Sequence, residues 1–148
     1  MWGVSERVTA REMLREKGMR VTELRRKVLE LLAEDGNPMS HMEIFERLAL
    51  EGRVPDRVTL YRMLNAFTTM QLVHRIRGTD GTMRFSLHKP RRTECPGNHP
   101  HFLCRTCGRM ICLYGQQLPR IDVPEGNLIE GKQMLVFGIC AACRKDKE

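Results

Sequence analysis

The feature that most constrains this chain is where its cysteines lie. All six are at or beyond residue 95 of 148, and four form two Cys-x-x-Cys pairs, Cys104 with Cys107 and Cys140 with Cys143. Two such pairs supply the four thiolates of a closed tetrahedral zinc site. Because the C-terminal third has few large apolar residues, it needs such a metal to fold stably. Unpaired buried cysteines, the alternative interpretation, would not explain this regular spacing.

The N-terminal segment argues against export. It carries charged residues every few positions and lacks the apolar block of a signal peptide, and no later segment approaches the length of a membrane span. We therefore expect a cytoplasmic protein with no membrane partner. In a reducing compartment, paired cysteines bind metal rather than form disulfides. The formal net charge of +7 is compatible with nucleic-acid binding.

The first 88 residues contain no cysteine and have the pattern of short helices followed by a β-hairpin. Helices are predicted over residues 5–17, from Thr22 to the "DGNP" segment, and from Ser40, where Glu43 completes a capping-box pattern and Ile44, Phe45 and Leu48 are expected to be buried. The segment "LVHRIRGTDGTMRFSL" has two β-rich runs around a turn. This order predicts a winged helix-turn-helix. The alternative is an amphipathic helical domain with a solvated charged face.

A fourth helix is predicted within "VPDRVTLYRMLNAFTTMQ", and it has two distinct faces. Apolar residues recur on one of them, at Leu60, Leu64 and Phe67. Polar residues recur at four-residue spacing on another, and in a winged helix-turn-helix such a face can enter the major groove of DNA. The candidate DNA-binding residues are Arg57, Thr59, Tyr61, Arg62 and Asn65.

Four segments, "RVTELRRKVLELL", "SHMEIFERL", "VTLYRML" and "DGTMRFSL", resemble in the same order the ferric uptake regulator family of bacterial metal-dependent repressors. "TLYR" is the most specific of these matches. The resemblance implies that Tyr61 contacts thymine methyls or sugars and that Arg62 contacts a phosphate. Arg25 stands where the family usually has Gln, and a more charged helix end is replaced by Thr68, Thr69 and Met70. These departures bear on the preferred DNA sequence.

The resemblance also implies how the chain is organised. We expect an α+β protein with a winged-helix DNA-binding domain over residues 1–88, a hinge over residues 89–98, and a small zinc-stapled α/β dimerisation domain over residues 99–148. Many family members carry the same two cysteine pairs in the dimerisation domain. The segment between the pairs lacks the pattern of a helix that other members have, so this domain should be mostly sheet.

A second metal site is predicted from the remaining nitrogen and sulfur donors, a mixture that suits zinc. His99 and His101 are two residues apart, so a strand would point both to one side. The resemblance to zinc uptake regulators implies that His74 at the base of the wing and Cys95 in the hinge join them in a regulatory site. Cys112 is a further candidate ligand, because some zinc-sensing members have an acidic ligand there. It could equally be a small buried residue.

The resemblance therefore implies a zinc-responsive transcriptional repressor that binds double-stranded operator DNA as a homodimer. Each chain would hold two zinc ions, one structural and one regulatory. An iron- or peroxide-responsive regulator of the same family is the main alternative. Those members use a His before the third helix and an acidic residue at the end of the wing, where this chain has Pro38 and Ser86.

Two other classes of protein explain the sequence less well. No enzyme is expected, because the HxE segment of zinc deaminases and the HExxH motif of metalloproteases are missing. A purely structural zinc ribbon that binds RNA or protein would explain the cysteine pairs. It would leave the "TLYR" helix and the remaining His and Cys donors without a role.

Overall fold

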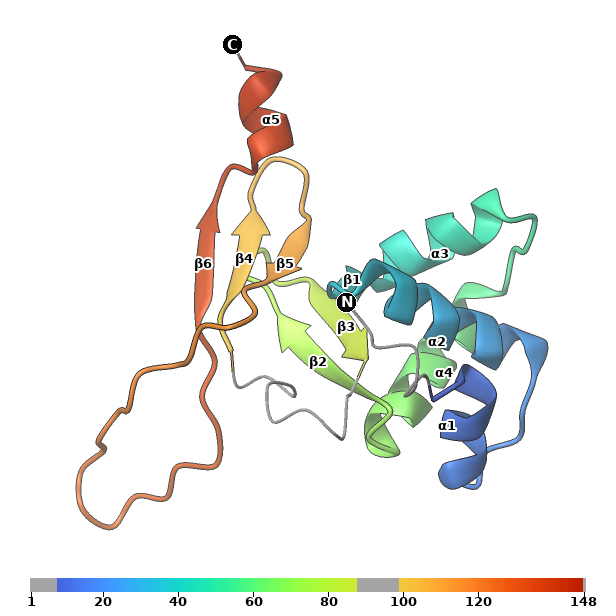
Figure 1. Cartoon of the computed structure of the whole chain (residues 1–148), viewed down its shortest axis with the longest axis horizontal. Coiled ribbons are helices and arrows are strands. Elements are labelled where there is room, and N and C mark those ends of the chain that lie inside the picture. The colour runs from blue at the N-terminus through green and yellow to red at the C-terminus, as the bar shows by residue number, and fades with distance from the viewer. Residues whose placement is uncertain (1–7, 88–98, 148) are drawn as a thin grey trace.

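The computed structural model describes residues 8–87 and 99–147. The N-terminal unit, residues 8–87, contains helices α1 (Ala10–Glu16), α2 (Glu23–Asp35), α3 (His41–Leu50) and α4 (Arg57–Thr69), and strands β1 (Met39–Ser40), β2 (Val73–Arg77) and β3 (Met83–Leu87). The C-terminal unit, residues 99–147, contains β4 (His101–Cys104), β5 (Met110–Cys112), β6 (Leu135–Gly138) and α5 (Ala141–Lys145). This arrangement confirms the predicted α+β class (Figure 1).

Capping residues set the helix ends. The Thr22 side chain accepts from the Arg25 amide at the start of α2, and Gly36, with φ of 73°, ends that helix in the left-handed conformation that glycine adopts readily. Ser40 accepts from the Glu43 amide at 3.1 Å and starts α3. The prediction that the first helix begins at residue 5 is wrong for Val8 and Thr9, which precede it, because Thr9 is itself the N-cap.

The main hydrophobic core lies between α2, α3, α4 and the β2–β3 hairpin. The predicted apolar face of α4 is confirmed, since Leu60, Leu64 and Phe67 are all fully buried. Ile44 and Leu48 of α3 are also buried, whereas the prediction for Phe45 is wrong because it is only partly buried. Its ring instead lies beneath the Arg57 guanidinium, 5.0 Å from the ring centre. Each buried side chain of this size stabilises the fold by about 1.5–3 kcal/mol.

The N-terminal sheet has the order β1-β3-β2, with antiparallel pairing throughout. Strands β2 and β3 and their turn form the wing, residues 73–87. Its register pairs His74 with Ser86 and Val73 with Leu87. Because β1 pairs with β3 immediately before α3 begins, the sheet ties the wing to the helices.

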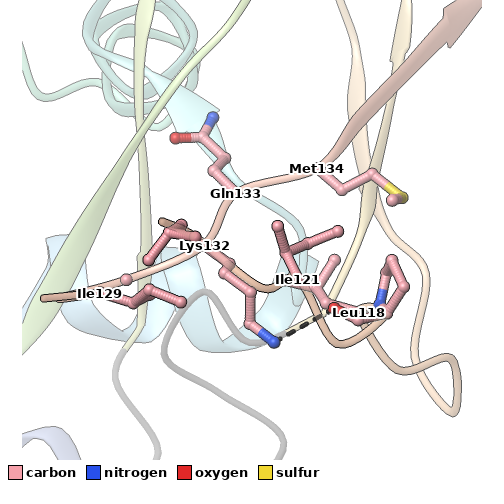
Figure 2. A pocket seen from close by; sticks show the side chains of 9 residues that line it. Leu118, Ile121, Ile129, Lys132, Gln133 and Met134 are labelled. Atoms are coloured by element: carbon pink, nitrogen blue, oxygen red, sulfur yellow. Dashed lines mark hydrogen bonds between the residues drawn. The ribbon is translucent and has the colours of Figure 1, made fainter. Parts of the chain in front are cut away.

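The C-terminal sheet has the order β5-β4-β6, with β4 and β5 antiparallel and β4 and β6 parallel. Residues 113–134, which connect β5 to β6, contain neither helix nor strand, in agreement with the prediction that this segment lacks a helix. This long connection projects from one end of the sheet (Figure 1). It surrounds a hollow of about 320 Å³ lined mainly by apolar side chains, including Ile121, Ile129 and Met134, with Lys132 donating to the Pro119 carbonyl at 3.2 Å (Figure 2).

The two units contact each other along the wing. Ile76 of β2 packs against Leu103 and Met110 of the C-terminal sheet. The guanidinium of Arg84, which is 2% exposed, donates to the Asp80 carboxylate and, at 2.7 Å, to the Gly108 carbonyl. No helix within residues 8–87 and 99–147 is long and apolar enough to cross a membrane.

Candidate metal centres

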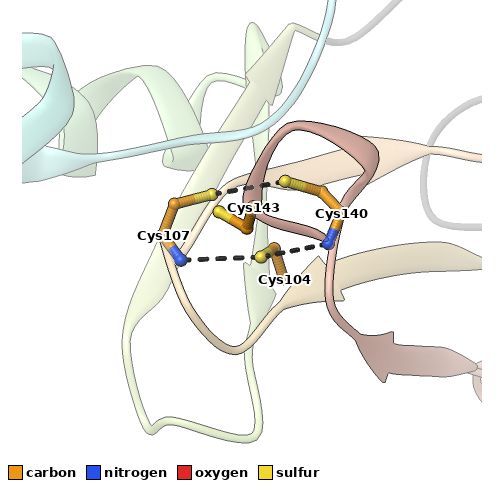
Figure 3. Close-up of side chains that lie close together, drawn as sticks. All are labelled: Cys104, Cys107, Cys140 and Cys143. Atoms are coloured by element: carbon orange, nitrogen blue, oxygen red, sulfur yellow. Dashed lines mark hydrogen bonds between the residues drawn. The ribbon is translucent and has the colours of Figure 1, made fainter. Parts of the chain in front are cut away.

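The four paired cysteines converge at one end of the C-terminal sheet (Figure 3). Cys104 ends β4, Cys107 lies in the turn before β5, Cys140 precedes α5 and Cys143 lies within it. Their sulfur atoms are all within 4.8 Å of one another. The turns bring the sulfurs together because the Gly108 amide donates to the Cys104 carbonyl, and the Arg144 amide to the Cys140 carbonyl, each at 2.9 Å.

The electrostatics of this four-cysteine cluster favour a bound cation. The backbone amides of Cys107 and Cys140 donate to the Cys104 sulfur, and they lower the pKa of that thiol to about 6. The neighbouring Cys140 sulfur and burial raise the pKa of Cys143 to about 12. One thiolate therefore forms readily, but four cannot coexist at neutral pH without a compensating positive charge. A divalent ion such as zinc provides that charge.

A second group of donors lies at the opposite ends of the same strands. His101 opens β4 and pairs in register with Cys112, which ends β5. His99 lies just before β4, with its ring centre 4.7 Å from that of His101. The nitrogen and sulfur donors of these three residues lie within 4.8 Å of one another, and all three residues are buried. We call this group the His/Cys cluster.

The ring of His101 is suited to metal binding. Burial, followed by electrostatic repulsion from the neighbouring His99 and His74 rings, lowers the pKa of His101 to about 4. The imidazole is therefore neutral at pH 7, the form that binds a metal. Among the residues that the structure describes, neither ring nitrogen of His101 has a hydrogen-bond partner. Buried polar atoms of this kind call for an explanation, and a bound ion is one.

Of the five predicted regulatory donors, the structure brings three together. Cys112, whose role the sequence left open, lies in the cluster with His99 and His101. His74 is half-buried in β2 and close enough to lower the pKa of His101, but its donor atoms are outside the 4.8 Å group. Cys95 and the whole of the expected hinge, residues 89–98, lie outside the described residues.

Sequence reasoning missed the polar residues that surround the His/Cys cluster. The ring of Tyr114 lies 5.2 Å from that of His99, and its hydroxyl donates to the Gly36 carbonyl at 2.7 Å. The Cys112 amide donates to the Asn37 side-chain oxygen at 3.1 Å. The two hydrogen bonds join residues more than seventy positions apart. No local pattern in the sequence signals such pairs.

The candidate DNA-binding face of α4 is open to solvent. Tyr61 is 51% exposed, and the other four candidates are exposed as well. Thr59 also has a structural role, since its amide and hydroxyl both donate to the Asp56 cap. The ring of His41 lies 4.6 Å from that of Tyr61, and its Nε2–H donates to the Arg57 carbonyl at 3.2 Å. The polar face is therefore anchored to α3.

Comparison with known proteins agrees with this architecture. The profile described as "Ferric uptake regulator family" matches residues 16–124. The chain is 29% identical over 141 residues to the ferric uptake regulation protein of Shigella flexneri, covering 90% of this chain and 91% of the relative. It is 27% identical over 145 residues to the peroxide operon regulator of Bacillus subtilis, covering 92% of each.

A similar solved structure supports the fold. It is a zinc uptake regulator complexed with zinc and DNA, with a TM-score of 0.59 at 17% sequence identity. The likeness covers 93% of this chain and 92% of that one. At this level of identity the comparison establishes the arrangement of the backbone.

Proposed function

The chain belongs to the ferric uptake regulator family of metal-responsive transcriptional regulators, and we propose that this member is a zinc-responsive repressor that binds operator DNA as a homodimer in the cytoplasm. Regulators of this family bind operator DNA and are not enzymes. The observation that carries the choice of zinc is the composition of the His/Cys cluster. Two imidazoles and a thiol are buried together there, and no carboxylate of residues 8–87 or 99–147 joins them.

The donor set distinguishes zinc from iron. His99, His101 and Cys112 would hold the regulatory ion, with His74 or Cys95 as the fourth ligand of a tetrahedral site. Borderline-soft zinc accepts nitrogen and thiolate donors together, whereas ferrous iron in regulatory proteins is commonly held by histidine and carboxylate. With the four-cysteine cluster, each chain would bind two zinc ions. An iron- or peroxide-responsive regulator remains the alternative, since regulators of both kinds are among the relatives.

The proposed domains follow the two units. Residues 1–88 would bind DNA, residues 89–98 would be the hinge, and residues 99–148 would form the dimer. The exposed apolar residues of β6 and the following turn support a dimer surface in the last of these, with Phe137 53% exposed beside Val136 and Ile139. In a two-fold dimer the two α4 helices would reach major grooves about 34 Å apart.

The mechanism is a restriction of domain orientation. A bound ion would hold the donor side chains close to one another. His99, His101 and Cys112 belong to the C-terminal unit, while His74 lies in the wing next to α4. Donors from both units that share one ion would limit the orientations the wing can adopt. Such coupling between two sites is commonly worth about 1–3 kcal/mol, or five- to 150-fold in DNA affinity.

The test is operator binding at buffered free metal concentrations. The duplex would be obtained by in vitro selection from a random library with the zinc-loaded protein. We expect affinity for the selected duplex to rise with free zinc, and the same protein with ferrous or manganous ion, after the structural zinc is in place, to respond less. An equal or larger response to ferrous ion would favour the iron-responsive alternative. No response to any metal would contradict the proposal.

A further inference from the structure

One turn of the N-terminal unit lies directly against the His/Cys cluster. This turn, Gly36–Asn37, connects α2 to β1. Its Asn37 side-chain oxygen accepts from the amide of Cys112, and its Gly36 carbonyl accepts from the hydroxyl of Tyr114. One of the two donors belongs to a residue of the cluster itself. The other belongs to a residue whose ring packs on His99.

The turn is built to transmit a displacement. Gly36 closes α2, with its amide donating to Leu32 at 3.1 Å. The Asn37 amide donates to the Asp35 carboxylate at 3.3 Å. Two residues later the chain enters β1, which pairs with the wing strand β3 and leads directly into α3. A shift of the turn therefore moves the end of one helix, the start of another and the edge of the wing sheet.

In the C-terminal unit, the two groups that donate these hydrogen bonds are also held in place by the His/Cys cluster. The donating amide and the sulfur of Cys112 belong to the same residue, so fixing the sulfur on an ion fixes the position of the amide. Tyr114 packs its ring on His99, so the orientation of that imidazole limits where the tyrosine hydroxyl can point. When the ligands of the cluster hold one ion, the Cys112 amide and the Tyr114 hydroxyl would therefore both be in position to donate to the turn.

We propose that Asn37 and Tyr114 are positioning residues that carry the state of the His/Cys cluster to the DNA-binding unit. This inference rests on the proposed zinc-dependent repressor function. Neither residue is among the three clustered donors, His99, His101 and Cys112. The two hydrogen bonds instead make the metal-bound geometry favour one docking of the turn. They supply a route between metal and DNA that does not pass through a ligand of the N-terminal unit.

The experiment that tests this proposal measures operator affinity with and without saturating zinc. It also measures the zinc affinity of the His/Cys cluster in the absence of DNA. Tyr114→Phe removes only the hydroxyl and keeps the ring on His99, and Asn37→Ala removes the acceptor. Asn37→Asp restores an acceptor at the same place. Asn127→Ala is the matched control, because it removes another asparagine side-chain hydrogen bond, to Pro124 at 2.9 Å, within the C-terminal unit.

We expect Tyr114→Phe and Asn37→Ala each to weaken operator binding by about two- to tenfold with zinc, the worth of one hydrogen bond. Binding without zinc, and zinc affinity without DNA, should stay within about twofold of wild type. Asn37→Asp should recover most of the response, and Asn127→Ala should match wild type. If the Tyr114→Phe and Asn37→Ala variants bound the operator more weakly by the same factor with and without zinc, or as tightly as wild type, the proposed role of Asn37 and Tyr114 would be overturned. The zinc response of the wild-type chain would still support the proposed function. If zinc did not change the operator affinity of the wild-type chain, both the proposed role of Asn37 and Tyr114 and the proposed function would be overturned.

Discussion

The two donor clusters lie at opposite ends of the same short strand and differ in almost every physical respect. Cys104, at the end of β4, belongs to a cluster of four sulfurs in which Cys107 is exposed. His101, at its start, belongs to a fully buried cluster of two imidazoles and one thiol. The donors of both clusters belong to the C-terminal unit, but the four-cysteine cluster lies next to α5. The His/Cys cluster lies against a turn of the N-terminal unit.

This difference supports separate roles for the two clusters, a structural role for the four cysteines and a regulatory role for the His/Cys cluster. Four thiolates from one unit complete a tetrahedral site and leave no open position, which is typical of a structural ion. Three donors leave one position to be filled, and the neutral His101 can take or release an ion at neutral pH without a proton change. A site with these properties, placed where the two units meet, is suited to sensing. The following predictions are ordered from the largest effect to the smallest.

Removing one ligand of the four-cysteine cluster should have the largest effect. In Cys104→Ser the C-terminal unit should lose its structural ion and with it the fold, because the binding free energy of such an ion, on the order of 10 kcal/mol, is also folding free energy. Circular dichroism and size-exclusion chromatography should show partial unfolding and loss of dimer. Cys112→Ser is the control, and it should remain a folded dimer. If both variants unfolded alike, the two clusters would not differ as described.

The stability of the metal-depleted second site should depend on pH. His101 has a folded pKa of about 4, below the 6.5 of an unperturbed histidine, so the unfolded chain binds the extra proton between these values. Its contribution is therefore complete above pH 6.5 and is lost as pH falls to 4, by up to about 3 kcal/mol. Urea unfolding between pH 4 and pH 6.5, with zinc bound only at the four-cysteine cluster, measures how the free energy of unfolding changes with pH. His101→Gln should flatten this dependence, and an unchanged slope in that variant would be evidence against a buried neutral imidazole.

Removing the donor that bridges the two units should reduce the metal response without unfolding either unit. His74→Ala and Cys95→Ser should both keep the dimer and the structural ion, and the variant that loses the fourth ligand should lose most of the zinc-dependent gain in operator affinity, about 1–3 kcal/mol. Isotherms with and without zinc, together with zinc content, check this. A full response in Cys95→Ser would leave Cys112 as the thiolate of the site. A full response in His74→Ala would mean that the signal crosses through the Gly36–Asn37 turn alone.

Substitutions on α4 should sharpen the comparison by changing DNA binding without changing metal sensing. Tyr61→Ala should cost about 1–3 kcal/mol at the selected operator and little on scrambled duplex, because a contact with thymine needs a thymine. Arg62→Ala should weaken both duplexes and reduce the salt dependence by about one unit of slope per subunit. In both variants the ratio of affinities with and without zinc should match wild type. A changed ratio would place α4 within the sensing route.

Local signals made the helices and the four-cysteine cluster predictable. Thr22, Gly36 and Ser40 act within one or two turns of their own positions, so capping patterns located the helix ends. Each cysteine pair is likewise a local turn. The contact of Asn37 with Cys112 and that of Arg84 with Gly108 depend on how strands from distant parts of the chain pack together. Periodicity and spacing carry no information about such pairs.

The His/Cys cluster falls between these two cases. The two-residue spacing of His99 and His101 predicted that they lie together, although His99 precedes β4 and is not part of the strand that the prediction assumed. Cys112 joins them only through the antiparallel register that pairs it with His101. The sequence named it as a candidate but left its role open, because a buried cysteine in a strand satisfies packing equally well.

Stepwise chelation of the zinc-loaded dimer tests most directly whether one cluster is structural and the other regulatory. Zinc per chain, dimer content and affinity for the selected operator would be measured on the same samples as chelator is added. We predict that one of two zinc ions leaves first, that operator affinity falls in step with its loss, and that the dimer persists until the second ion is removed. Loss of both ions in a single step, or full operator affinity after the first has left, would contradict this account.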